Sequence, residues 1–125
     1  MIFPAPENER IPSGHYQFRL NRDPELKKFT YKDKNGDDKE GRKIVLFAVG
    51  LNDKGQYQIR DEIAVFDQRY TDFLAAVGVE HSKDVTVQGA VFEADVVYEA
   101  DKKNPLKSWP RLANIIASGG DDIPF

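Results

Sequence analysis

The stretch RKIVLFAVGLNDKGQYQIRDEIAVFDQRYTDFLAAVG, residues 42–78, decides the fold of this chain. Its first part, residues 42–51, is almost continuously apolar, which is typical of a strand that is buried on both faces. The polar run at 52–55 ends in glycine and predicts a turn. Residues 57–66 then alternate between apolar and polar side chains, so we expect a second strand there.

A helix is predicted directly after these two strands. Asp67 is a suitable N-terminal cap, and Gly78 is a suitable residue for the C-terminal end. The apolar residues between them recur at i, i+3, i+4 and i+7: Tyr70, Phe73, Leu74 and Val77. This spacing places them on one face of an amphipathic helix of about three turns.

One more strand region, with a break at Asp23-Pro24, is predicted before this stretch. Residues 15–21 and 26–32 both alternate, and Asn35-Gly36, which follows them, is a strong hairpin signal. Residues 1–12 contain three prolines and little periodicity. We interpret them as an extended N-terminal arm.

Three elements are expected after the helix. Residues 84–91 predict a strand with Val85 and Val87 pointing inward, and residues 92–99 predict another strand. Residues 108–117 are expected to form a short helix, because three apolar residues lie at helical spacing: Leu112, Ile115 and Ile116.

This order of elements predicts an all-β fold with one main helix. Three strand regions, a helix and two further strands match the OB-fold, a five-stranded Greek-key barrel with a helix between its third and fourth strands. A small α+β sandwich fits the same order. We expect residues 1–117 to form the domain, including the N-terminal arm, and residues 118–125 to form a flexible acidic tail.

The composition excludes several classes of protein. A chain of 125 residues allows one domain with a single core. The absence of cysteine excludes disulfides, thiolate zinc sites and cysteine nucleophiles. No apolar run reaches the roughly 20 residues that cross a bilayer, and no apolar leader follows a basic N-terminus. We therefore expect a cytoplasmic protein with no membrane partner.

The sequence contains no catalytic constellation. His15 and His81 lack the spacing of metal ligands, and the acidic pairs Asp37-Asp38 and Asp121-Asp122 fall in a predicted loop and in the tail. No glycine-rich phosphate loop is present. We expect a protein that is not an enzyme and that holds no metal and no cofactor.

The net charge of −3 is unevenly distributed along the chain. Residues 15–47 contain nine Lys or Arg against six Asp or Glu, whereas the last five residues concentrate negative charge. A basic face with an acidic tail is compatible with DNA binding, and also with an ordinary protein surface.

The C-terminus has the properties of a docking peptide. Gly119-Gly120 precede a segment with two carboxylates, a stiff Ile-Pro step and a terminal aromatic ring: Asp121, Asp122, Ile123, Pro124 and Phe125. A partner could hold the aspartates with a basic rim, the ring in an apolar socket, and the terminal carboxylate with a cation. The alternative is a solvated acidic end without a role.

This tail resembles the C-terminal tip of bacterial single-stranded-DNA-binding proteins, which end in an Asp-rich stretch followed by Ile-Pro-Phe. Four further segments are similar to that family: the Asp-Pro-Glu turn within residues 20–27, the apolar strand 44–49, the strand end Ile-Ala-Val-Phe at 63–66, and Val-Thr-Val-Gln-Gly at 85–89. The resemblance implies an OB-fold that coats single-stranded DNA as a homo-oligomer, often a tetramer. It also implies that replication, recombination and repair enzymes are recruited through Phe125.

The chain departs from the family pattern at several positions. Phe18 stands where the family usually has glycine, and Arg60 stands where it has a base-stacking tryptophan. The position of another tryptophan of the family falls near Val96. The long linker before the tail is missing. These differences indicate a diverged member, of the kind that a phage or mobile element encodes.

A protein that binds single-stranded DNA needs cations along a groove and flat side chains on which bases stack. Phe66 is the best stacking candidate, because it is the apolar exception on a face shared with Arg60 and Gln58. Arg60 can stack on a base or bind a phosphate. Four cations flank the predicted hairpin: Lys28, Lys32, Arg42 and Lys43. The other aromatic candidates are Phe29, Tyr31 and Trp109.

Each candidate also has a purely structural interpretation. Phe66 could cover the end of the barrel, the cations could be ordinary surface charges, the hairpin aromatics could pack together, and Trp109 could anchor a terminal segment. The whole chain could instead be an interaction module that docks on host replication enzymes through its tail without binding DNA. A structural β-protein of a virion is a third possibility.

Overall fold

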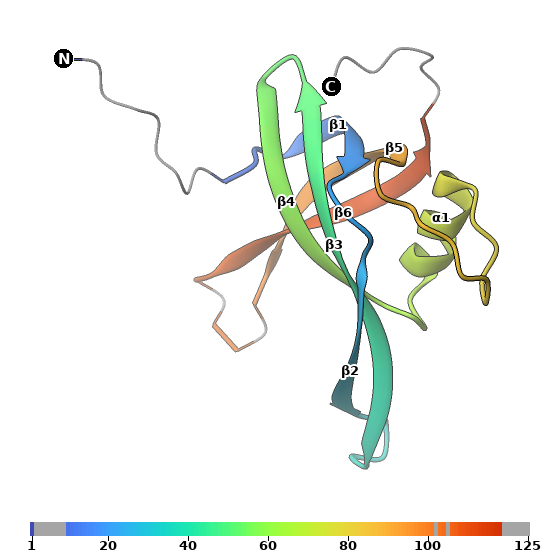
Figure 1. Ribbon diagram of the computed structural model, residues 1–125. Coiled ribbons are helices and arrows are strands. Elements are labelled where there is room, and N and C mark those ends of the chain that lie inside the picture. Colours follow the sequence, from blue (N-terminus) through green and yellow to red (C-terminus); the bar gives the residue numbers. More distant parts are fainter. Residues whose placement is uncertain (2–9, 102, 105, 119–125) are drawn as a thin grey trace.

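Six strands and one helix make up the part of the chain that the computed structural model describes, which is residues 1, 10–101, 103–104 and 106–118. The elements follow in the order β1 (Gly14–Leu20), β2 (Glu25–Lys32), β3 (Asp38–Asn52), β4 (Gly55–Ala64), α1 (Gln68–Val77), β5 (Val91–Ala100) and β6 (Ser108–Ala117) (Figure 1). Most of the expected N-terminal arm and nearly all of the expected tail lie outside the described residues.

The strands form one curled antiparallel sheet. Its order is β2-β3-β1-β5-β6, and β4 pairs with β3. The 15-residue β3 is long enough to pair with β1, β2 and β4, and the β2–β3 hairpin projects from the body (Figure 1). The helix packs mainly against β6. A mostly β structure with one helix and a curled sheet is consistent with an OB-like barrel.

The place of the helix in the strand order differs from the prediction. The helix follows β4, whereas the sequence predicts it between the third and fourth strands. The reason lies between β1 and β2, where Leu20 pairs with Ala48 and Glu25 pairs with Val45. Leu20 and Glu25 are five residues apart, but their partners on β3 are only three residues apart. The two extra residues between β1 and β2 divide the first strand region into two strands.

The helix itself has the ends that the sequence predicts. The carboxylate of Asp67 accepts a hydrogen bond from the backbone N–H of Arg69 at 3.0 Å, and Gly78 adopts a left-handed φ of 71°. Phe73 is buried beneath it. No helix in the described part of the chain has the length and apolar character needed to cross a membrane.

The predicted strand at residues 84–91 is wrong. These residues form a loop, and β5 begins only at the last of them. The carboxylate of Asp23 accepts hydrogen bonds from the backbone N–H groups of Val87 at 2.6 Å and Gln88 at 3.0 Å. Val87 packs against the core, but Val85 is exposed rather than inward. In a strand, these backbone N–H groups would donate to the carbonyls of a neighbouring strand. Here the Asp23 carboxylate accepts their hydrogen bonds, so residues 84–91 do not need a partner strand.

The predicted short helix at residues 108–117 is also wrong, because these residues form β6. Between two of their pairs, β6 has one more residue than β5, which is a β-bulge. Asn114 adopts a φ of 52° at this point. The extra residue allows Leu112 and Ile115 both to be buried although they are three positions apart. The bulge thus imitates the spacing of a helix.

The core lies inside the curl of the sheet. Phe18 stacks on Phe92 with ring centroids 5.4 Å apart, and Phe73 meets Phe92 edge-on at 5.7 Å. Gly50 is paired with Phe18 across β1 and β3. A Cβ atom at position 50 would lie 2.6 Å from the Phe18 ring, so the glycine provides the space for it.

Buried Asp61 joins β4 to α1 and β6. Its side chain is 1% exposed, and its carboxylate accepts hydrogen bonds from Arg69 Nη1 at 3.0 Å, Arg111 Nη1 at 3.2 Å and the backbone N–H of Leu112 at 2.9 Å. A buried carboxylate is stable only with such partners. The cluster holds β4 beside β6 although these two described strands share no ladder.

Candidate nucleic-acid interface

Three aromatic side chains meet at the β2–β3 hairpin. The ring centroids of Phe29 and Tyr31 are 5.7 Å apart, and Phe66 lies 5.9 Å from Phe29 and 5.3 Å from Tyr31. We call these three residues the aromatic cluster. Phe66 is 65% exposed and Tyr31 is 37% exposed. The cluster therefore presents flat apolar surface to solvent, as a platform for stacked bases requires.

Strand pairing brings the aromatic cluster together. Phe29 lies opposite Gly41 on β3, and a Cβ atom on that glycine would approach the Phe29 ring to 3.0 Å. Beyond the end of β4, the backbone N–H of Val65 still donates to the carbonyl of Arg42 at 2.9 Å. This extension of the ladder carries Phe66 alongside Gly41 and onto the Phe29 ring.

Lys43 and Arg60 lie on the same face of the sheet as the aromatic cluster. Lys43 Nζ is 5.6 Å from the centre of the Phe29 ring and 3.1 Å from Oε1 of Glu62, and Arg60 Nη2 is 3.3 Å from the same oxygen. Burial disfavours the charged form of Glu62, but Lys43 and Arg60 outweigh this effect and lower its pKa. One carboxylate thus holds two cations beside the rings.

The other three predicted cations do not join this arrangement. Lys28 and Lys32 alternate with the cluster residues of β2, and Arg42 lies opposite Lys28, so all three belong to the other face of the hairpin. Lys28 pairs with Glu40 at 3.5 Å and Lys32 pairs with Asp38 at 2.8 Å. The sequence groups four cations that the structure distributes over two faces.

Sequence reasoning missed Arg22 and Phe47. The guanidinium of Arg22 lies over the Phe47 ring, 3.8 Å from its centre. Phe47 pairs with Arg60 across β3 and β4. It is six residues from Gly41 along β3, or about 20 Å. An exposed guanidinium on a ring can itself stack on a base, so this pair is a second candidate platform on the same face.

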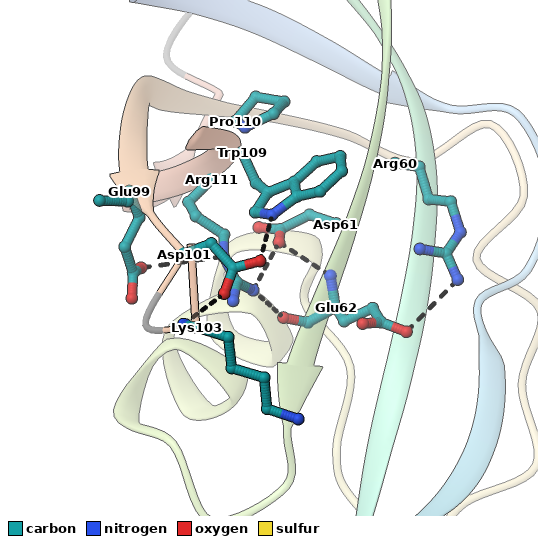
Figure 2. A pocket seen from close by; sticks show the side chains of 10 residues that line it. Arg60, Asp61, Glu62, Glu99, Asp101, Lys103, Trp109, Pro110 and Arg111 are labelled. Atoms are coloured by element: carbon teal, nitrogen blue, oxygen red, sulfur yellow. Dashed lines mark hydrogen bonds and ion pairs between the residues drawn. The ribbon is translucent and has the colours of Figure 1, made fainter. Parts of the chain in front are cut away.

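Trp109 lies in a separate groove beside the ends of β5 and β6. The groove has a volume of about 600 Å³, and Arg60 also lines it, so it contains two of the predicted residues. Figure 2 shows the Trp109 indole directed towards the side on which Arg60 lies. The indole is 54% exposed, and its N–H donates to Asp101 Oδ2 at 3.5 Å.

Asp23 connects two of the segments on which the family resemblance rests. It belongs to the Asp-Pro-Glu turn, and the backbone it binds belongs to the segment 85–89. The backbone N–H of Val87 is the main cause that lowers the pKa of Asp23, and Thr86 and Gln88 add to it. The turn therefore holds the 85–89 loop in place, directly beside Arg22.

His15 is the only histidine of the described residues that contacts carboxylates. Its Nε2 lies 2.9 Å from Glu93 Oε1, and its Nδ1 lies 2.7 Å from Asp95 Oδ1. Hydrogen bonds to Glu93 and then to Asp95 raise the pKa of His15. Among the described residues, no group of three or more His, Cys, Asp or Glu is placed to hold a metal ion.

Comparison with known proteins adds no assignment. No protein-family model matches the chain, and neither a curated protein nor a solved structure matches it. The predicted partner-binding residues 121–125 lie outside the described residues.

Proposed function

We propose that this protein binds single-stranded DNA without strict sequence specificity and protects it during replication, recombination or repair. The observation that carries the proposal is the exposed aromatic cluster, with Lys43 beside it, on a hairpin that projects from the body. Each base that stacks on such a platform contributes about 1–3 kcal/mol, and cations beside the platform bind phosphates.

The DNA path that these residues favour follows β3. A strand would stack a base on the aromatic cluster, pass Lys43, and reach the Arg22–Phe47 pair on the same face. Arg60 flanks this path opposite Phe47. Both ends of the path then offer stacking surfaces, and the cations between them offer partners for the backbone.

The proposal includes an OB-fold in the strict sense. If β1 and β2 are counted as one bent strand, the sheet has five strands and α1 lies between the third and the fourth. The pairings of this bent strand with β3 and β5, of β3 with β4, and of β5 with β6 support a Greek-key order. The proposed DNA path then lies on the second and third strands, the face on which OB-folds bind oligonucleotides.

We extend the proposal to the family and its partners. The chain would be a diverged, non-enzymatic member of the bacterial single-stranded-DNA-binding family that forms homo-oligomers. Its tail, which ends in Ile123, Pro124 and Phe125, would recruit replication and repair enzymes. The Asp-Pro-Glu turn, which organises the loop next to Arg22, and the sequence of the tail support this assignment.

Filter binding with the full-length protein tests the proposal. Oligo-dT should bind far more tightly than duplex DNA of the same length, and its affinity should fall steeply as salt rises from about 50 mM to about 200 mM. Equal and weak binding to both would refute it. An interaction module would instead leave the fluorescence of Trp109 unchanged on addition of oligonucleotide, and would lose its protein partners when residues 121–125 are deleted.

A further inference from the structure

The groove at Trp109 has a composition that a purely phosphate-binding surface would not have. Its volume of about 600 Å³ falls within the range of small-ligand sites. Four acidic residues line it together with the exposed indole: the buried Asp61, and Glu62, Glu99 and Asp101. Carboxylates repel phosphates and can only accept hydrogen bonds when ionised. A DNA backbone is therefore disfavoured here, whereas a base that carries hydrogen-bond donors is favoured.

Glu99 is the best placed of these acceptors. It is the cross-strand neighbour of Trp109, and its side chain is 59% exposed. Its Oε2 lies 3.8 Å from Arg111 Nε, a buried atom that has no hydrogen-bond partner among the described residues. The same Arg111 is fixed from the other side by buried Asp61. Glu99 thus lies beside the indole in an ion pair with Arg111, and most of its surface remains free for a ligand.

Three cations line the groove. Arg111 pairs with Glu99, whereas Arg60 and Lys103 make no ion pair with it among the described residues. Figure 2 shows Arg60 across the groove from Trp109, and Lys103 on the side of Asp101. A base on the indole would leave its own phosphate near the rim, where Arg60, which pairs with Glu62 but is half exposed, would bind it. Figure 2 also shows Glu99 on the far side of Trp109 from Arg60. One nucleotide could therefore place its phosphate at Arg60 and point its base inward to Glu99.

We propose that this groove binds a guanine of single-stranded DNA, stacked on Trp109 and read by Glu99. The inference rests on the proposed DNA-binding function and adds a base preference at one position. The N1–H and N2–H groups of guanine lie side by side and match the two oxygens of one carboxylate. Thymine presents carbonyl oxygens on both sides of its N3–H, and a carboxylate repels them. Adenine and cytosine offer a single amino group, so they rank between the two.

Titration of the full-length protein with two labelled oligonucleotides tests this inference. One contains only thymidine, and the other has a single guanine at its centre. The guanine should increase affinity about tenfold, as a good two-point base contact does. Glu99→Ala should abolish this preference, and it should not weaken binding of the all-thymidine strand, because the carboxylate that repels the thymine carbonyl oxygens is gone. Glu80→Ala is the matched control, because Glu80 is also exposed and also makes one ion pair, with Lys83 at 2.7 Å.

The outcomes separate this inference from the proposed function. If neither oligonucleotide binds, both fail. If both bind with equal affinity, the protein still binds single-stranded DNA but the guanine site does not exist. If the preference persists in Glu99→Ala and in Trp109→Leu, another part of the protein reads the base, and the inference is overturned.

Discussion

At the scale of single residues, Phe66 carries the proposed DNA site most directly. Phe66→Ala should weaken binding of single-stranded DNA about tenfold, because one stacked base is worth about 1–3 kcal/mol. The same change should lower the free energy of unfolding by only about 1 kcal/mol, because the mostly exposed ring loses its contacts with Phe29 and Tyr31. Fluorescence anisotropy with labelled oligo-dT measures the first quantity, and urea denaturation the second.

Ile116→Ala provides the control for Phe66→Ala. Ile116 is also largely exposed, but it lies on β6 and outside the aromatic cluster. Ile116→Ala should change neither the affinity for single-stranded DNA nor the free energy of unfolding. Equal DNA affinity for Phe66→Ala and the unchanged protein would show that no base stacks on the aromatic cluster.

Part of the candidate site follows from the sequence alone. Because side chains alternate between the two faces of a strand, the sequence places Phe66 and Arg60 on the same face. The same rule places Lys28 and Phe29 on opposite faces. The pair of Arg22 with Phe47 could not be found in this way. Phe47 lies within an apolar run that looks like core, and its contact with Arg22 depends on how the chain bends between β1 and β2.

At the scale of secondary-structure elements, Asp61 connects β4 with α1 and β6. Asp61→Ala should lower the free energy of unfolding by about 3–5 kcal/mol, because it leaves Arg69 and Arg111 without their shared buried partner. Chemical denaturation measures this loss. Asp38→Ala removes an exposed pair with Lys32 instead and should cost less than about 1 kcal/mol. Similar losses in the two variants would mean that the buried cluster does not hold the elements together.

His15 joins β1 to β5 in a pH-dependent way. Its pKa is raised in the folded state, so its contribution to stability is complete below the ordinary histidine value of about 6.5 and is lost as pH rises through the raised value. Solvent screens this pair, so we expect a change of no more than about 1 kcal/mol. Urea denaturation between about pH 5 and pH 8 measures it.

The two histidines provide a matched comparison. His15→Gln should remove the pH-dependent step, whereas His81→Gln should retain it, because the His81 ring shares a hydrogen bond with Ser82 and forms no ion pair with a described carboxylate. A step that persists without His15 would assign the effect to another group.

The elements differ in how far local sequence determines them. The helix after Asp67 was predictable because its caps and its apolar face all lie within a dozen residues. The loop before β5 was not, because Asp23 supplies its acceptors from more than sixty residues away. In β6, the bulge at Asn114 changes which residues are buried, and this bulge depends on the pairing with β5.

At the scale of the whole molecule, the tail and the domain should divide their tasks. Deletion of residues 121–125 should leave the affinity for single-stranded DNA unchanged or slightly increased, because an acidic tail competes with phosphates for the same cations. Anisotropy titrations of the full-length and shortened proteins measure this effect. A marked loss of affinity on deletion would contradict the proposed division.

Two variants of the tail distinguish the effect of its charge on DNA affinity from the binding of partner enzymes. Replacement of Asp121 and Asp122 by Asn should reproduce the effect of the deletion on DNA affinity. Phe125→Ala should leave DNA affinity unchanged and reduce only the capture of partner enzymes. A change in DNA affinity with Phe125→Ala would show that the ring itself reaches the DNA-binding face.

The contact between Phe18 and Gly50 has a consequence for the ancestry of the chain. The ring of one residue occupies the space that any side chain on the other would need. In any lineage that gains this ring at position 18, position 50 must already hold glycine or change together with it. Relatives should therefore carry either a large residue at 18 with glycine at 50, or a small residue at 18 with freedom at 50. Paired substitution at positions 18 and 50 could therefore identify relatives whose overall sequence similarity is no longer detectable.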